Sequence, residues 1–242
     1  MRRVQVIAHR GASAISPENT MVAFRRAIEV GADAIETDVQ LTKDGHLILI
    51  HDELVNRTTN GTGWVKDYTL QQLRKLDAGS WFSKSYQYEK IPTLDDFFTF
   101  IQSSKIWVNI EIKNGLFPYP GIEEKLILKI REYQMTSRVV VSSFNHYSLF
   151  KFHHLAPDIK TAVLYMTGIF EPWTYAKRIG AIGLHPYKEV VSKRLIVHAH
   201  QLGMTVYPFT VDDPKEMKEL NNLGVDGIMT NVPDRLILLM KS

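Results

Sequence analysis

The sequence contains no cysteine among its 242 residues. Disulfide bonds, thiolate metal sites and a cysteine nucleophile are therefore excluded. A metal ion, if the protein binds one, must be held by oxygen or nitrogen ligands. The lack of cysteine fits a reducing compartment, although oxidising compartments also contain cysteine-free proteins.

Long apolar runs are missing as well. After Met1-Arg2-Arg3, only the five residues Val4–Ala8 precede the polar pair His9-Arg10, whereas a secretory signal needs an apolar run of roughly 7–15 residues. No run approaches the ~20 residues of a transmembrane helix. We therefore expect a cytoplasmic protein that does not insert stably into a membrane.

The sequence also lacks an excess of charge of one sign. It has 29 Lys and Arg against 26 Asp and Glu, a formal net charge of +3, and no long run of either sign. Proteins that bind nucleic acids usually concentrate basic residues. We therefore expect a small-molecule partner and no nucleic acid, while the oligomeric state stays open.

What is present is an alternation of short apolar runs with longer helix-patterned stretches. Helices are predicted between the strands, for example at 18–30, 94–103, 122–133, 214–223 and 233–240, and Gly31 and Gly224 suit the ends of two of them. The eight predicted strands are Val4–Ala8, Ala34–Gln40, Trp107–Lys113, Val139–Phe144, Thr161–Tyr165, Ile182–His185, Val206–Val211 and Gly227–Thr230.

Eight strands that are each followed by a helix are typical of a (β/α)8 TIM barrel, and the chain length suits one such domain spanning residues 1–242. The alternative is an open doubly wound sheet. That fold usually carries a G-x-G-x-x-G turn after its first strand, and residues 9–13 do not match this pattern. The sequence therefore favours the barrel.

One stretch after the second strand interrupts the alternation. Asp44-Gly45 between alternating runs predicts a hairpin, in which a two-residue turn would set Asp38 opposite His51 and a three-residue turn would shift the pairing by one. Residues from about 52 to 92 are rich in small, polar and aromatic side chains. We interpret them as an insertion at the mouth of the barrel, where substrate-selecting loops lie, with a merely decorative loop as the alternative.

Three carboxylates fall on predicted strands at positions that share one face. Glu36 and Asp38 are two residues apart, and Glu111 has the same spacing from Lys113. Buried carboxylates are costly unless a positive charge neutralises them. Oxygen ligands favour a hard ion, so we predict that Glu36, Asp38 and Glu111 bind Mg²⁺ or Ca²⁺, with Mn²⁺ as a further candidate. An ordinary network of ion pairs is the alternative.

Two histidines and two cations accompany the carboxylates. His9 follows the first strand and His51 follows the hairpin, and imidazoles suit proton transfer near neutral pH. Arg10 and Lys113 suit the binding of an anionic oxygen, such as that of a phosphoryl group. His185, at the end of the sixth strand, is ambiguous. The residues by themselves predict a barrel that processes an oxyanion, and a carboxylate substrate would fit nearly as well.

The same residues resemble the signature of the glycerophosphodiester phosphodiesterase family. The resemblance covers nearly the whole chain, with the motifs in order. The matching segments are His9-Arg10-Gly11, Pro17-Glu18-Asn19-Thr20, Glu36-Thr37-Asp38-Val39, His51-Asp52, Glu111-Ile112-Lys113, Ser142-Ser143-Phe144 and Asp226-Gly227-Ile228-Met229-Thr230-Asn231-Val232-Pro233.

The resemblance implies a hydrolase that cleaves a glycerophosphodiester to sn-glycerol 3-phosphate and an alcohol. A route through a cyclic phosphate, formed by the substrate's own 2-hydroxyl, is compatible with this chemistry. The implied roles are metal binding by Glu36, Asp38 and Glu111, acid–base catalysis by His9 and His51, and phosphate binding by Arg10 and Lys113.

Two parts of the motif set need separate comment. The family often has Trp-Thr-Val-Asn where this chain has Phe209-Thr210-Val211-Asp212, so Phe209 is expected to line the pocket without an indole donor. Glu18 and Asn19 we interpret as anchors of the loop after the first strand.

Three other functions stay open. A lysophospholipase D or a phosphatidylinositol phospholipase C-like diesterase would use the same architecture on lipids. A non-catalytic phosphate-binding barrel is a further alternative, although none of the expected histidines or carboxylates is missing. An isomerase or aldolase would leave the two histidines unexplained. The sequence leaves open the alcohol, the preferred ion, and which histidine is the acid.

Overall fold

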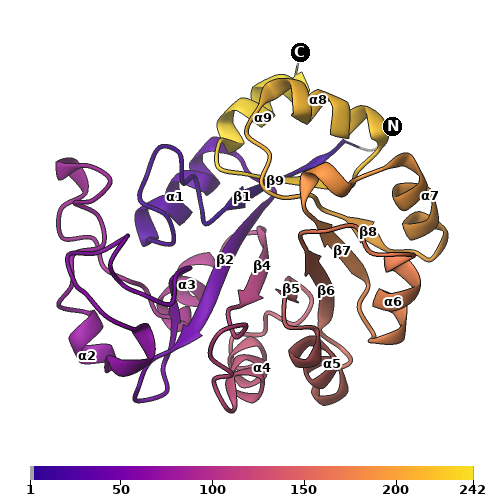
Figure 1. Cartoon of the computed structure of the whole chain (residues 1–242). Coiled ribbons are helices and arrows are strands. Elements are labelled where there is room, and N and C mark those ends of the chain that lie inside the picture. Colours follow the sequence, from indigo (N-terminus) through magenta and orange to yellow (C-terminus); the bar gives the residue numbers. More distant parts are fainter. Residues whose placement is uncertain (1–2, 242) are drawn as a thin grey trace.

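The computed structural model describes residues 3–241; Met1, Arg2 and Ser242, which fall within the predicted domain, lie outside the described residues. Strands gather around a central axis and helices surround them (Figure 1). The strands follow the order β8-β7-β6-β5-β4-β2-β1-β9. Their bounds are β1 Gln5–His9, β2 Ala34–Leu41, β4 Trp107–Ile112, β5 Val139–Ser143, β6 Lys160–Tyr165, β7 Gly183–Pro186, β8 Thr205–Val206 and β9 Gly227–Thr230.

The two ends of this order are joined by backbone hydrogen bonds. The Asp226 N–H donates to the Val206 carbonyl at 3.1 Å, and the Met229 N–H donates to the Pro208 carbonyl at 3.0 Å. The segments around β8 and β9 are therefore neighbours, and the parallel strands close into a barrel. The predicted (β/α)8 barrel is confirmed.

The segment around β8 differs from its prediction, which extended the strand to Val211. Regular pairing ends at Val206, and Pro208 has no N–H to donate to a ladder. An isolated bridge between Tyr187 and Phe209 continues the contact with β7. Proline therefore shortens the strand without opening the barrel.

The helices form where the sequence supplies both a cap and an apolar face. For α1, the Thr20 hydroxyl accepts from the Ala23 N–H and Gly31 ends the helix at φ 89°. The helices packed around the strands are α1 Met21–Val30, α3 Leu94–Ile101, α4 Ile122–Glu132, α5 His146–Leu155, α6 Pro172–Arg178, α7 Lys193–Gln201, α8 Pro214–Leu223 and α9 Pro233–Lys241. Among residues 3–241, none is long and apolar enough to cross a membrane.

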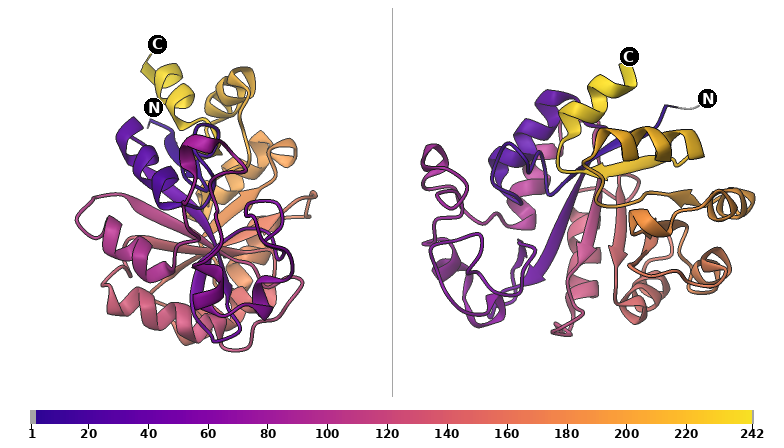
Figure 2. Two further views of the ribbon diagram at one scale, coloured as in Figure 1. Left: turned by 90° about the vertical axis from the view of Figure 1, so that its left-hand side faces the viewer. Right: turned by 45° about the horizontal axis from the view of Figure 1, so that its top comes forward.

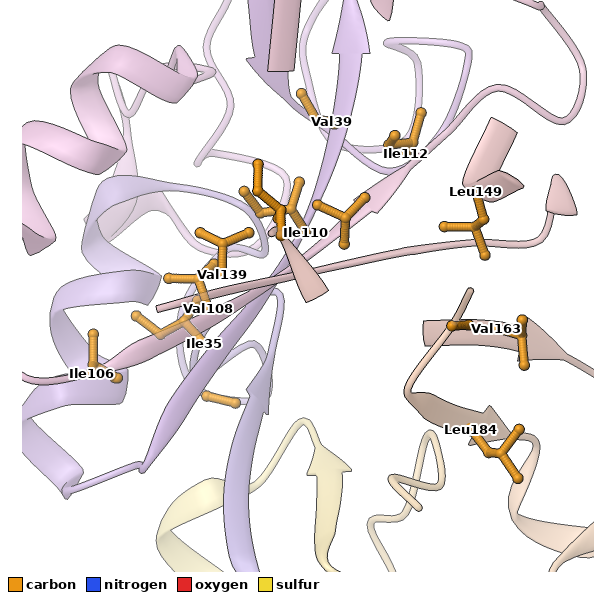
Figure 3. Packing of buried hydrophobic residues seen from close by; sticks show 14 of the residues in the cluster. Ile35, Val39, Ile106, Val108, Ile110, Ile112, Val139, Leu149, Val163 and Leu184 are labelled. Atoms are coloured by element: carbon orange, nitrogen blue, oxygen red, sulfur yellow. The ribbon is translucent and has the colours of Figure 1, made fainter. Parts of the chain in front are cut away.

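Alternation along the strands separates two environments. On β2 and β4, the side chains of Ile35, Val39, Val108, Ile110 and Ile112 belong to the main hydrophobic core between the strands and the helices (Figure 3). The intervening residues face the barrel interior, because successive side chains point to opposite sides of a strand.

The interior itself has an apolar floor. Ile7, Ala34, Tyr207 and Met229 form a separate buried cluster, with Trp107 packed against it. Ile7 pairs with Ala34, which in turn pairs with Trp107. The next inward positions toward the carboxyl ends of β1, β2 and β4 carry polar side chains, so those side chains stand above a packed layer.

A hairpin precedes the insertion. Strand β3 (Leu47–Leu49) pairs antiparallel with β2 in the register Val39–Leu49 and Leu41–Leu47. The turn has three residues, 43–45, because the Thr42 N–H donates to the His46 carbonyl and Gly45 takes φ 81°.

Of the two turn lengths considered, the structure has the three-residue turn, so the pairing is shifted by one position and Asp38 is not opposite His51. The Ile50 N–H donates to the Asp38 carbonyl, so Asp38 faces Ile50. The side chain of Thr42 stabilises the longer turn, since its hydroxyl contacts the Asp44 carboxylate at 2.6 Å and accepts from the His46 N–H at 2.9 Å.

The insertion itself is folded. It contains two 3₁₀ turns, η1 Val65–Asp67 and η2 Lys84–Tyr86, and the short helix α2 Leu70–Leu73. A further 3₁₀ turn, η3 Lys188–Val190, lies between β7 and α7. Apolar residues of the insertion and of the segment at β3 form a small core of their own, made of Ile48, Ile50, Val55, Val65, Leu73, Ala78 and Ile91. Figure 2 places the insertion at one side of the barrel, beside β2.

Gly11 provides a test of how closely the loop after β1 packs on α1. Its φ is +83°, and a Cβ there would lie 2.7 Å from the backbone carbon of Ala23, whereas at Gly203, with φ +71°, an added Cβ meets nothing within 4 Å. We expect Gly203→Ala to lower the free energy of unfolding by about 1–2 kcal/mol, the cost of left-handed backbone. Gly11→Ala should lose about 1–3 kcal/mol more through overpacking. Urea unfolding of both variants measures this, and equal losses would contradict the close packing.

Candidate active site

Three buried carboxylates meet at the carboxyl ends of β2 and β4. Asp38 and Glu111 are paired in the parallel register, and Glu36 lies one inward position below Asp38. One ligand oxygen from each of the three lies within 4.8 Å of the others. We call these residues the carboxylate trio, and they could hold a metal ion.

The trio is electrostatically strained. Burial raises the pKa of Glu36 well above its ordinary value, and the charge of Asp38 raises it further. Burial also raises the pKa of Glu111. Burial acts in the same direction on Asp38, but the charges of Arg10, His51 and Lys113 and the hydrogen bond from Asn19 together outweigh it and hold the pKa of Asp38 at about 2. The negative charges of the buried carboxylates therefore repel one another.

The donor set fits a divalent cation. Asp38 Oδ1 is buried and has no hydrogen-bond partner among the described residues. Asp38 Oδ2 accepts from Asn19 Nδ2 at 2.9 Å, and Asn19 Oδ1 accepts from the Thr37 hydroxyl at 2.7 Å. A fixed, buried carboxylate oxygen without a partner, next to two further carboxylates, is what a hard cation would satisfy.

Asn19 therefore does more than anchor its loop, which is the role interpreted from the sequence. Its side chain ties Asp38 to the neighbouring Thr37, and its backbone takes φ 53° to do so. Glu18, beside it, also lies in the site, where its carboxylate accepts from Arg10 Nη1 at 2.9 Å.

His9 is held on one side of the trio. Its Nδ1 lies 2.7 Å from Asn231 Oδ1 and its Nε2 lies 3.9 Å from Glu36 Oε2. Asn231 Nδ2 donates to the Asp212 carboxylate at 2.7 Å, which fixes the direction of the amide. Because Asn231 Oδ1 can only accept, the network assigns the proton of neutral His9 to Nδ1 and leaves Nε2 free. Burial, together with the charge of Arg10, lowers the pKa of His9 to about 4.

His51 is held differently, by a carboxylate. Its Nδ1 lies 2.6 Å from Asp52 Oδ1, and its Nε2 lies 3.2 Å from Lys113 Nζ. The hydrogen bond with His51 lowers the pKa of Asp52, so Asp52 is an acceptor and Nδ1 of His51 carries the proton. The His51 side chain is 29% exposed against 14% for His9. The two rings therefore present equivalent nitrogens in different electrostatic settings.

Two cations flank the trio. The Arg10 backbone N–H donates to Glu36 Oε2 at 2.9 Å, and Arg10 Nε forms an ion pair with Asp38 Oδ2 at 3.4 Å. Lys113 Nζ lies 2.9 Å from Glu111 Oε1. Burial works to lower the pKa of Lys113, but the charges of Glu111 and Asp38 and the hydrogen bond to Glu111 together outweigh it and raise the pKa. Three carboxylates and two cations leave one net negative charge in this cluster.

Phe209 and His185 lie apart from the cluster. The Phe209 ring is 5.9 Å from the ring centre of Phe144 and 6.3 Å from that of Tyr187, at the carboxyl ends of the strands. His185 is fully buried beside Tyr207, neither ring nitrogen has a hydrogen-bond partner among the described residues, and burial lowers its pKa to about 3. The structure thus brings seven of the eight predicted site residues into one cluster and places Phe209 in an aromatic group at the same end.

The sequence analysis named Asp52, Asp212 and Asn231 only within motifs, without a role, and did not name Arg57. Asn231 and Asp212 hold His9, Asp52 holds His51, and Arg57 contacts Asp52 from the insertion. An amide or carboxylate just beyond a strand end is a weak signal that could have indicated Asp212 and Asn231. Nothing in the pattern around Arg57 indicates a contact with the site.

The chain is similar to known proteins of one family. The model of the glycerophosphoryl diester phosphodiesterase family matches residues 9–235. A glycerophosphodiester phosphodiesterase of Caldanaerobacter subterraneus subsp. tengcongensis is 51% identical over 98% of this chain and 97% of its own. One of Bacillus altitudinis is 48% identical over 96% of each chain.

Among solved structures, an Oleispira antarctica phosphodiesterase in complex with the product sn-glycerol-3-phosphate superposes with a TM-score of 0.90 and 30% identity, covering 99% of this chain and 98% of the other. The resemblance of the sequence motifs and the predicted enzyme class are thereby confirmed. The chain belongs to the glycerophosphoryl diester phosphodiesterase family.

Proposed function

We propose that the protein hydrolyses glycerophosphodiesters to sn-glycerol 3-phosphate and an alcohol. The observation that carries the proposal is the cluster itself, in which two histidines, each held through Nδ1, and two cations surround the carboxylate trio. Membership of the family, and the product bound to the Oleispira antarctica relative, support the choice of a glycerophosphodiester over other oxyanions.

Glu36, Asp38 and Glu111 would hold one divalent cation, with Mg²⁺ or Ca²⁺ preferred and Mn²⁺ as a further candidate, because the set offers only carboxylate oxygens. When bound, the ion would supply positive charge to a phosphoryl oxygen. Arg10 and Lys113 would bind the remaining phosphoryl oxygens, since both stay protonated beside their carboxylate partners.

The histidines would divide the proton transfers. In the first step the substrate's 2-hydroxyl oxygen forms a bond to phosphorus and gives its proton to one imidazole. The phosphorus–alcohol bond breaks, and the leaving oxygen takes a proton from the other imidazole. Water then opens the cyclic phosphate by the reverse transfers, giving sn-glycerol 3-phosphate.

The hydrogen-bond partners suggest which ring plays which part. Asp52 places a negative charge against the His51 ring, whereas Asn231 gives His9 a neutral partner. We therefore assign His51 as the acid and His9 as the base of the first step. Phe209, with Phe144 beside it, would form an apolar wall of the pocket.

Metal dependence is tested with glycerophosphocholine as the substrate. After treatment with EDTA we expect no release of glycerol 3-phosphate, and Mg²⁺, Ca²⁺ or Mn²⁺ should restore it. The same ions should raise the melting temperature, because they bind the folded state. Full turnover in EDTA, with the ions leaving the melting temperature unchanged, would contradict a metal site in the trio.

The assignment of the histidines is tested by changing the leaving group. His9→Ala and His51→Ala should each lower the turnover of glycerophosphocholine by about 10²–10⁴-fold, the usual contribution of a general acid or base. With glycerophospho-p-nitrophenol, whose leaving group needs little protonation, His51→Ala should recover most of its rate of p-nitrophenol release and His9→Ala should not. Equal losses on both substrates would overturn the division of roles, and wild-type rates would remove the residue from the mechanism.

A further inference from the structure

Arg57 lies in the insertion and binds two carboxylates at once. Its Nη1 and Nη2 donate to the two oxygens of Glu18 at 2.7 and 2.8 Å. Its Nε and Nη2 donate to the two oxygens of Asp52 at 2.7 and 3.0 Å. Arg57 therefore forms bidentate hydrogen bonds with both carboxylates, as the planar guanidinium allows. Bidentate bonding fixes the orientation of each carboxylate as well as its position.

Each of these carboxylates also holds a residue of the candidate site. Glu18 Oε1 accepts from Arg10 Nη1 at 2.9 Å, and Asp52 Oδ1 lies 2.6 Å from His51 Nδ1. The contacts form a continuous chain from Arg10 through Glu18, Arg57 and Asp52 to His51. The chain joins the end of β1 to the segment after β3, which are far apart in the sequence.

The exposure of the chain's members is graded. The Glu18 side chain is 12% exposed, while that of Asp52 is 29% and that of Arg57 is 44% exposed. A simple surface ion pair of such exposure contributes little to stability, because water competes for both partners. Here the value of Arg57 lies elsewhere: it is the shared partner of two carboxylates that each hold an active-site cation or imidazole.

We propose that Arg57 is a positioning residue for both ends of the site. Through Asp52 it holds the His51 ring with Nε2 toward the substrate, and through Glu18 it holds the guanidinium of Arg10. The insertion would then contribute to catalysis by fixing the phosphate-binding and proton-transferring groups relative to one another. This inference rests on the proposed phosphodiesterase function.

The main rival is that Arg57 only attaches the insertion to the barrel. Arg74 supplies a matched control, because it lies in the same insertion, pairs with Asp96 and is 39% exposed, and among residues 3–241 its side chain pairs with no residue of the site. Arg57→Ala should lower kcat for glycerophosphocholine by about 10–100-fold, as expected for loss of a partner that orients a reacting group. Arg74→Ala should leave kcat and KM unchanged. Arg57→Lys keeps the positive charge but cannot form the bidentate hydrogen bonds, so its kcat should lie between those of Arg57→Ala and the wild-type protein.

The effect of Arg57 through Asp52 on His51 can be separated from its effect through Glu18 on Arg10. Asp52→Ala should lower kcat with little change in KM, since it releases the ring of His51. Glu18→Gln should mainly raise KM, since it weakens the hold on Arg10, and Arg57→Ala should show both effects. If Arg57 acts on His51 through Asp52, the double variant Arg57→Ala/Asp52→Ala should have nearly the kcat of Asp52→Ala alone, because effects within one network are not additive.

A readout without substrate separates this proposal from the proposed function. In the intact protein, ¹⁵N NMR of the imidazole nitrogens should place the proton of neutral His51 on Nδ1. Arg57→Ala should shift the Nδ1 and Nε2 signals of His51 toward a mixture of the two neutral tautomers, one with the proton on Nδ1 and one with the proton on Nε2. Arg74→Ala should leave these signals unchanged.

The outcomes are distinct. If the wild-type protein cleaves no glycerophosphodiester but the His51 signals respond to Arg57→Ala, the proposed function fails and the positioning role stands. If the wild-type protein is active, the positioning role is overturned by unchanged kinetics and NMR in Arg57→Ala, by equal losses in Arg57→Ala and Arg74→Ala, or by additive losses of kcat in the double variant.

Discussion

Three carboxylates are buried close together at the carboxyl ends of the barrel strands, and the arrangement of the candidate site depends on them. Charges of one sign that are removed from water repel each other strongly and need compensation close by. Arg10 and Lys113 supply two positive charges, the Asn19 amide fixes one carboxylate, and the Arg10 backbone N–H fixes another. The remaining negative charge and the unpartnered oxygen of Asp38 are what a divalent cation would complete.

The barrel can carry this arrangement because its strands separate two environments. Outward-facing isoleucines and valines pack under the helices, while the inward positions begin with the apolar floor around Ile7 and Ala34 and end with Glu36 and Asp38. The floor fills the interior below the charged layer and closes it on that side. Stability and chemistry are thus assigned to alternate residues of the same strands. The candidate site is placed by strand register, while the loops supply the groups that orient it.

Much of this followed from the sequence, and the physical reason is the fixed period of a strand. Two-residue spacing put Glu36 with Asp38 and Glu111 with Lys113, and capping residues such as Thr20 and Gly31 marked α1. The hairpin was predicted but its register was left open between two turn lengths, and the Thr42 side chain, which stabilises the three-residue turn, decides between them. The contacts of Arg57 could not be foreseen, since an irregular insertion has no period from which a direction in space can be inferred.

The proposed binding of one divalent cation by the trio can be measured without substrate. Equilibrium binding of Mn²⁺ is followed by the electron paramagnetic resonance of the free ion, in the wild-type protein and in Asp38→Asn. Asp38→Asn removes one of the three carboxylates while keeping the shape of the side chain. We expect one tight Mn²⁺ site per chain, and we expect it to be lost or greatly weakened in Asp38→Asn. Binding of equal tightness in both proteins, or the absence of a tight site in the folded wild-type protein, would contradict the proposal.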